Sequence, residues 1–129
     1  MIVVDSSVWI DFLNGIRSPQ VARLFDRLGE EPLLVGDLIL LEVLQGVASE
    51  SEAARVEAAL RRFDVEPMLD PDLAVTAAAH TRSLRGLGLT LRKTIDLVIG
   101  TFCIARGHTL LTADRDFLPM AKHLGLQLI

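Results

Sequence analysis

The sequence lacks several features that define large classes of protein. A single cysteine in 129 residues excludes an internal disulfide and favours a reducing compartment. No stretch reaches the roughly 20 nearly uncharged residues of a membrane span, because Asp37 and Glu42 interrupt the most apolar segment, residues 32–47. The apolar segment at residues 2–4 is too short for a signal peptide, and the first basic residue, Arg17, follows it. We therefore expect a cytoplasmic protein.

Internal repeats and linkers rich in glycine, serine or proline are also missing. Hydrophobic residues make up 50% and charged residues 23%, which is ordinary for a globular chain and excludes a disordered or low-complexity one. The length predicts one domain over residues 1–129. The net charge of −4 argues against a simple nucleic-acid binder, which usually carries a basic excess.

Short apolar segments alternate with segments of helical periodicity along the whole chain. Strands are expected at residues 2–4, 32–35, 65–69, 109–112 and 126–128, and helices at 8–13, 19–28, 37–47, 51–63, 71–86, 94–106 and 117–124. Uniformly apolar strands separated by helices indicate a parallel sheet covered on both faces. The predicted fold is therefore a single three-layer α/β/α domain with a short parallel central sheet. Ser18 and Asp70, each followed by proline, predict helix starts, and Asp37 and Thr94 are expected to cap two more helices.

Carboxylates follow two of the predicted strands. Asp5 ends the first strand, and Asp114 and Asp116 follow the strand at 109–112. In an open parallel sheet, ligands bind outside the carboxyl ends of the strands, so these side chains are expected at one edge.

Glu42 and Asp96 stand within strongly apolar helical segments, where an unpartnered carboxylate is costly. Glu42 could instead be a surface charge or pair with an arginine. Asp96 could be a first-turn acid favoured by the helix dipole. Gly46 and Gly100 each follow one of these acids by four residues, either to clear space beside it or to let the helix pack closely against the sheet.

If Asp5, Glu42, Asp96 and Asp114 converge, a divalent cation would relieve their repulsion. Oxygen ligands favour Mg²⁺ or Mn²⁺ over Zn²⁺, and the three histidines and Cys103 lack metal-ligand spacing. Cys103 is expected to pack as a small apolar residue.

Basic residues gather just before Asp96. Without the four converging carboxylates the net charge of −4 becomes 0, and residues 73–95 contain no acid. Five basic residues could hold RNA phosphates or form solvated helix faces. They are Arg82, Arg85, Arg92 and Lys93 in this region and Arg115 between Asp114 and Asp116.

The ordered set of these residues resembles the PIN-domain ribonucleases. It comprises Ile2-Val3-Val4-Asp5-Ser6-Ser7, an isolated Glu42, Asp96 in a late helix, and Thr112-Ala113-Asp114-Arg115-Asp116-Phe117. The length and one-domain layout resemble the VapC-type toxins of toxin–antitoxin pairs. The resemblance implies an endoribonuclease that depends on Mg²⁺ or Mn²⁺, forms a homodimer, and is inhibited by an antitoxin segment in or near the acidic groove.

The resemblance also implies roles for single residues. Asp5, Glu42, Asp96 and Asp114 match the family's acidic quartet, Asp116 a common fifth acid, and Ser6 and Thr112 supporting hydroxyls. Asp5 and Asp96 are expected to bind the metal directly, with Asp114 and Asp116 in the same metal set. Glu42 and Asp114 would complete the shell or orient water.

Other functions fit the sequence less well. A receiver-type signalling domain needs a lysine at the end of the last strand, and Lys93 and Lys122, the only lysines, lie elsewhere. A haloacid-dehalogenase-type phosphatase needs an aspartate where Ser7 stands. A PIN-like domain that binds RNA or protein without cutting remains the alternative. Trp9, Phe12, Leu13 and the helices within 18–63 are candidates for partner contacts, although Trp9 fits the core slightly better.

Overall fold

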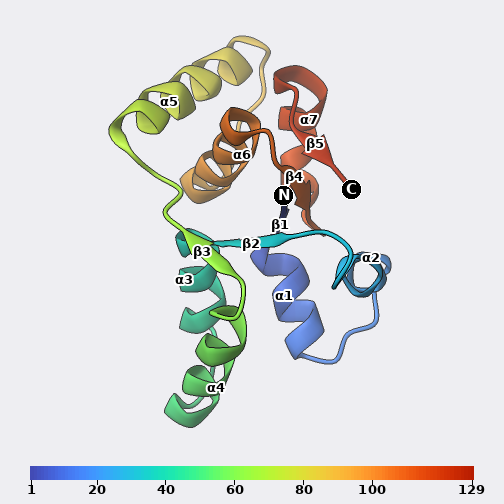
Figure 1. Ribbon diagram of the computed structural model, residues 1–129. Coiled ribbons are helices and arrows are strands. Elements are labelled where there is room, and N and C mark those ends of the chain that lie inside the picture. The colour runs from blue at the N-terminus through green and yellow to red at the C-terminus, as the bar shows by residue number, and fades with distance from the viewer.

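The computed structural model describes all residues, 1–129. Five short parallel strands form one sheet in the order β3-β2-β1-β4-β5 (Figure 1). The strands are β1 (Ile2–Val4), β2 (Leu33–Gly36), β3 (Asp64–Glu66), β4 (Thr109–Leu111) and β5 (Gln127–Leu128). The register pairs Val3 with Leu34 of β2 and Val4 with Leu111 of β4, which places β1 at the centre.

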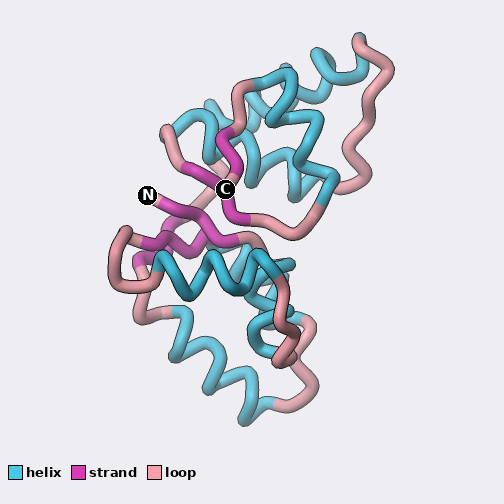
Figure 2. The backbone as a smooth tube through the Cα atoms, turned by 90° about the vertical axis from the view of Figure 1, so that its right-hand side faces the viewer, coloured by secondary structure: helices cyan, strands magenta, loops and turns pink.

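Helices cover both faces of the sheet. They are α1 (Ser6–Leu13), α2 (Pro19–Arg27), α3 (Asp37–Gln45), α4 (Glu50–Leu60), α5 (Pro71–Gly86), α6 (Thr94–Arg106) and α7 (Leu118–Leu124), with a 3₁₀ turn η1 (Arg115–Phe117) before α7. The strands lie between two groups of helices, with α1, α3 and α4 on one side and α5, α6 and α7 on the other (Figures 1 and 2). The predicted three-layer α/β/α fold is confirmed. No helix is long and apolar enough to cross a membrane.

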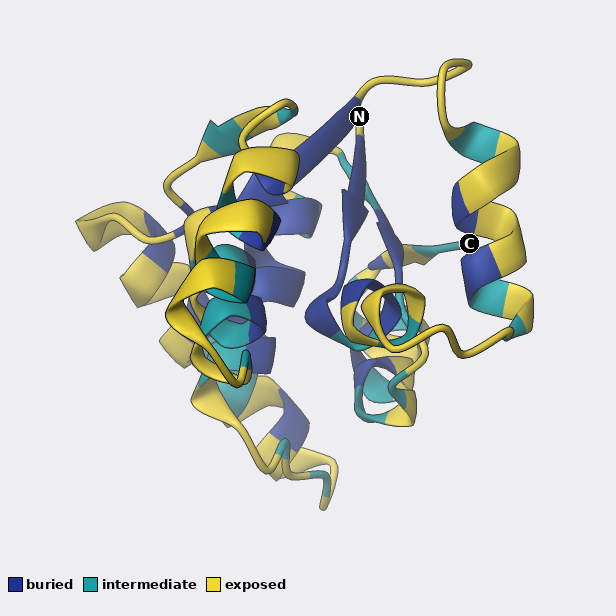
Figure 3. Cartoon of the chain, turned by 90° about the horizontal axis from the view of Figure 1, so that it is seen from below, coloured by how far each residue is buried: buried dark blue, intermediate teal, exposed yellow.

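The central strands are buried along their whole length. Every residue of β1 and β2 is buried, whereas the edge strand β3 exposes both of its acidic residues (Figure 3). Burial on both faces explains why the inner strands read as continuous apolar runs rather than as alternating ones. One cluster of 28 buried apolar residues joins the sheet to its two helical layers.

Two of the four predicted helix caps are confirmed and two are wrong. Ser18 Oγ accepts the Val21 N–H at 3.1 Å, and Asp70 Oδ1 accepts the Leu73 N–H at 2.7 Å. Asp37 is instead the first residue of α3, and its Oδ1 accepts the N–H of Met68 at 3.0 Å across the chain. Thr94 is the first residue of α6, and Lys93 occupies the N-cap without a side-chain hydrogen bond.

Gly46 and Gly100 do not clear space beside the acids. A Cβ on Gly100 would lie 2.4 Å from Met120 Sδ, so Gly100 lets α7 pack closely against α6. Gly46 is the C-cap of α3, and the nearest atom to a Cβ there is the Val43 carbonyl oxygen at 3.8 Å. Gly100 therefore serves packing between two helices and not the expected packing of helix on sheet, and Gly46 ends α3.

Candidate active site

The strand order reverses at β1, and in such a sheet the ligand crevice is expected outside the carboxyl ends of the strands. The chain leaves β1 toward β2 on one side, and β4 later pairs with β1 on the other side. Asp5 directly follows β1, and its N–H donates to the Leu111 carbonyl oxygen at 2.9 Å, which ties it to the end of β4. Asp114 follows β4 at the same edge of the sheet.

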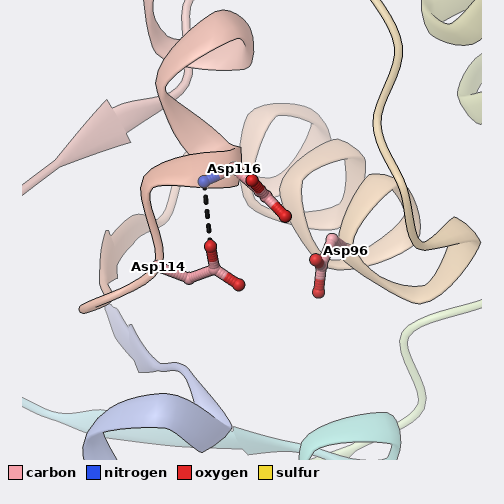
Figure 4. A group of neighbouring side chains, drawn as sticks. All are labelled: Asp96, Asp114 and Asp116. Carbon is pink, nitrogen blue, oxygen red and sulfur yellow. Dashed lines mark hydrogen bonds between the residues drawn. The ribbon is translucent and has the colours of Figure 1, made fainter.

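Three aspartates come together here. Asp96, Asp114 and Asp116 each offer a carboxylate oxygen, and these oxygens all lie within 4.8 Å of one another (Figure 4). Asp96 projects from the first turn of α6 and is buried, whereas Asp114 and Asp116 are half-buried. The Asp116 N–H donates to Asp114 Oδ1 at 2.9 Å, which fixes the turn that carries both acids.

Asp5 and Glu42 stand beside this group of three but are not members of it. Asp5 is only 3% exposed, and its Oδ2 accepts hydrogen bonds from the hydroxyls of Ser7 at 2.7 Å and Thr112 at 2.9 Å. Glu42 projects from α3, and its Oε1 accepts a hydrogen bond from Ser6 Oγ at 3.2 Å. The two hydroxyls predicted to support the site, Ser6 and Thr112, thus contact different acids.

Burial and mutual repulsion raise the pKa of two of these carboxyls. The pKa of Asp96 is raised to about 7, chiefly by burial and then by the negative charges of Asp5 and Asp114. The pKa of Glu42 is also raised, chiefly by burial and then by Asp5. The Lys93 ammonium acts in the opposite direction on both groups without offsetting the increase.

None of the clustered acids has a cationic partner within the protein. The three ion pairs join Arg27 to Glu31, Arg61 to Glu57 and Arg106 to Asp70, all outside the site. An arginine pair for Glu42 is therefore excluded. Asp96 does lie in a first helical turn, but the rise in its pKa shows that burial and repulsion outweigh any benefit from the helix dipole.

The donor set fits a divalent cation. Asp5 Oδ1 and Asp96 Oδ2 are buried and have no hydrogen-bond partner, which is costly for carboxylate oxygens. A cluster built from carboxylate oxygens suits a hard cation such as Mg²⁺ or Mn²⁺. Cys103 is fully buried, and burial raises the pKa of its thiol to about 12, so it packs as a small apolar residue, as predicted.

The predicted basic residues are all exposed and come from three parts of the chain. They are Arg82 and Arg85 on α5, Arg92 and Lys93 before α6, and Arg115 in η1. Arg82 and Arg85 line a groove of about 510 Å³ between α5 and α6 that also includes Thr94, two residues before Asp96. Arg115 stands between Asp114 and Asp116 in the chain.

Ser7 is the site residue that sequence reasoning missed. It contacts Asp5, and its Oγ also accepts the Ala113 N–H at 3.1 Å. The available signal was its place in the first turn of the helix that starts directly after Asp5. Its partner beyond β4 lies 106 residues away, which a local pattern does not reveal.

The chain is similar to known proteins along nearly its whole length. A VapC ribonuclease of Mycobacterium bovis and ribonuclease VapC11 of Mycobacterium tuberculosis are each 27% identical to the chain over 132 residues, covering 98% of this chain and 96% of the relative. The structure resembles VapBC2 of Rickettsia felis bound to a DNA fragment from its promoter (TM-score 0.79, 16% identity, 100% and 98% of the two chains).

A second solved structure has the same fold. It is VapC20 of Mycobacterium tuberculosis, described as a toxin that cleaves the sarcin–ricin loop (TM-score 0.66, 19% identity, 92% of this chain and 93% of that chain). Residues 2–123 of the present chain match the model of the PIN domain. The chain therefore belongs to the PIN-domain family.

Proposed function

We propose that the protein is the toxin of a toxin–antitoxin pair and an endoribonuclease that hydrolyses RNA with a divalent cation. The observation that carries this proposal is the group of three aspartates, Asp96, Asp114 and Asp116, with Asp5 and Glu42 close enough to raise the pKa of Asp96. Two buried carboxylate oxygens of the site, on Asp5 and Asp96, lack partners. The names of the relatives, VapC ribonucleases, support the same activity. No acid of the predicted set is missing, so nothing favours the alternative of a non-cleaving domain.

Each acid has a role that its surroundings support. Asp96, Asp114 and Asp116 would hold the cation, and Asp5 would add its free oxygen Oδ1. A bound Mg²⁺ or Mn²⁺ supplies Lewis acidity toward the scissile phosphate and lowers the pKa of water. Glu42 is oriented by Ser6, and its raised pKa suits it to accept a proton from the attacking water. Attack by water would leave 5′-phosphate and 3′-hydroxyl ends.

RNA would lie across the acidic crevice with its flanking phosphates on the exposed basic residues. Arg92 and Lys93 are the nearest of these in sequence to Asp96, and the Lys93 charge reaches both Asp96 and Glu42. Arg82 and Arg85 extend the positive surface along α5, and Arg115 supplies a charge from η1. These residues would position the backbone and not select the sequence that is cut.

The apolar surface along α1 is our candidate for the antitoxin. Ile10, Phe12 and Leu13 are each more than a third exposed. Leu13 and Val56 line two adjoining grooves, of about 220 and 200 Å³, that separate α1 from the neighbouring helices. Trp9 is 5% exposed, so it belongs to the core as expected while forming part of one groove wall. Because the exposed side chains are apolar and lie along one helix, the proposed occupant is an amphipathic antitoxin segment.

Two further expectations accompany the toxin assignment. We propose a cytoplasmic location, which agrees with the single reduced cysteine and the VapC relatives. We also propose a homodimer, as the family resemblance implies, which light scattering after size exclusion would measure directly.

The activity is testable with the purified chain and total bacterial RNA. EDTA should stop cleavage, and Mg²⁺ or Mn²⁺ should restore it, because the ligand set is built from carboxylate oxygens. Asp96→Asn should remove cleavage and leave the circular dichroism spectrum unchanged. Cleavage that persists in EDTA, or that only Zn²⁺ restores, would contradict the proposed chemistry.

A further inference from the structure

Two hydroxyls converge on the same oxygen of Asp5. Ser7 Oγ lies 2.7 Å and Thr112 Oγ1 lies 2.9 Å from Oδ2. The other carboxylate oxygen, Oδ1, is buried and has no hydrogen-bond partner. One oxygen of this side chain therefore accepts two hydroxyl donors, and the other is left free.

Backbone contacts determine where the hydroxyl hydrogens go. Ser7 Oγ accepts the Ala113 N–H at 3.1 Å, and Thr112 Oγ1 accepts the Asp114 N–H at 3.0 Å. Each hydroxyl has one hydrogen to donate, and Asp5 Oδ2 is its nearest acceptor. The two hydroxyl oxygens lie 3.4 Å apart, and neither hydroxyl then donates to the other. Two N–H groups that follow β4 are thus linked to Asp5, each through one hydroxyl.

The neighbouring serine has a different partner. Ser6 donates to Glu42 Oε1 at 3.2 Å and makes no side-chain hydrogen bond to Asp5. Ser6 and Ser7 both lie in the first turn of α1, where their side chains point in different directions around the helix. Consecutive residues of one turn therefore orient two different acids of the site.

We propose that Ser7 is a positioning residue that holds the Asp5 carboxylate with Oδ1 free for the divalent cation. This inference rests on the proposed function, because a cation is what gives the free buried oxygen a partner. The last torsion of an aspartate side chain is broad, so a carboxylate is not fixed by its own rotamer. Without the Ser7 hydroxyl, Oδ2 keeps a single side-chain donor and Asp5 gains orientations in which Oδ1 is turned away.

Titration of Mn²⁺ alone into the metal-free chain, followed by calorimetry, tests this role without any substrate. Ser7→Ala should weaken Mn²⁺ binding by about 10-fold, the lower end of the effect of removing a residue that orients a metal ligand. Ser7→Thr keeps a hydroxyl at the same position and should bind nearly as tightly as the wild type. Ser83→Ala, which removes an exposed hydroxyl from α5, is the matched control and should leave the affinity unchanged.

A purely structural role makes a different prediction. If Ser7 only joins the ends of β1 and β4 through Ala113, Ser7→Ala will lower the urea midpoint and leave the Mn²⁺ affinity at the wild-type value. That result would overturn the proposal. Thr112→Val provides a second measurement, because the double variant should lose less affinity than the sum of the single losses. A wild-type chain that binds no Mn²⁺ would overturn the proposed function itself, which is visible before any variant is made.

Discussion

Asp96 lies in the first turn of α6, where the helix dipole favours a carboxylate, and yet its pKa is raised to about 7. Burial contributes most, and the charges of Asp5 and Asp114 add to it. The same residue that would hold a cation therefore destabilises the cation-free protein. This conflict is typical of binding sites, in which the ligand and not the fold satisfies the charge.

Because the pKa of Asp96 is raised, the stability of the metal-free chain should depend on pH. The carboxyl has a pKa of 3.8 unfolded and about 7 folded, so the folded state binds more protons between these values. The free energy of unfolding should thus fall as the pH rises from about 4 to about 7. In EDTA, the wild type should have a higher urea midpoint at pH 5.5 than at pH 8.

The matched variant is Asp96→Asn, which removes the charge and keeps the shape. It should be more stable than the wild type at pH 8 by about 1–3 kcal/mol, less than the full shift because the neighbouring acids adjust. Its own fall in stability between pH 5.5 and pH 8 should be smaller. Glu42 still contributes a fall in this variant, whereas His80 and His108, whose pKa values are lowered chiefly by burial, contribute a rise in both proteins. An equal pH difference in both proteins would show that Asp96 does not titrate in this range.

The sequence signals for the acids are local, and the structure brings three of them, Asp96, Asp114 and Asp116, together. Asp5 and Asp114 each follow a strand. Glu42 and Asp96 each lie in a strongly apolar helix. Sequence reasoning did not find Ser7, because the hydrogen bond from Ala113 depends on the register of β1 against β4, set by the pairing of Val4 with Leu111.

At the scale of helices and strands, the apolar pattern predicted all five strands and the helices between them, while details that depend on distant contacts were missed. Thr94 fails as a cap because it is itself the first residue of α6, with Lys93 at the N-cap. Gly100 faces Met120, a residue of the last helix, so its role depends on packing between α6 and α7. Contacts between residues so far apart in the chain produce no periodic pattern in the local sequence.

The packing of α6 against α7 is testable at Gly100. Gly100→Ala should destabilise the fold by about 1–3 kcal/mol, because the added methyl would overlap the fully buried Met120 thioether. Gly86→Ala is the control, since no atom lies within 4 Å of a Cβ there and alanine favours helix by up to about 1 kcal/mol. Urea denaturation measures both. A stabilising Gly100→Ala would contradict the packing role.

At the scale of the whole molecule, acidic and basic groups are arranged around one crevice. The net charge of −4 conceals this arrangement, because three aspartates lie together and the charge of exposed Lys93 reaches Asp96 among them. A cation bound by these acids would leave a surface suited to a polyanion. The antitoxin surface that we propose lies along α1 and its neighbouring grooves, which Leu13 and Val56 line.

Reversing two charges beside the crevice should weaken RNA binding. The double variant Arg92→Glu and Lys93→Glu removes phosphate contacts, so its affinity for RNA should fall and depend less steeply on salt. The control reverses two exposed arginines distant in sequence, Arg17→Glu and Arg55→Glu, and matches the change in net charge. Filter binding at several salt concentrations gives, for each double variant, the slope of RNA affinity against salt concentration on logarithmic scales. Equal slopes in the two double variants would leave residues 92 and 93 as a solvated surface.

The most direct test of the central claim is to map new RNA 5′ ends in bacteria that express the wild type or Asp5→Asn. The wild type should produce new 5′-phosphate ends at a few sites and arrest growth, and the variant, though soluble and folded, should produce neither. Because an expression host can lack the target RNA, the experiment uses a host related to the source organism. The absence of new ends there, with folded wild-type protein free of antitoxin, would contradict the ribonuclease assignment.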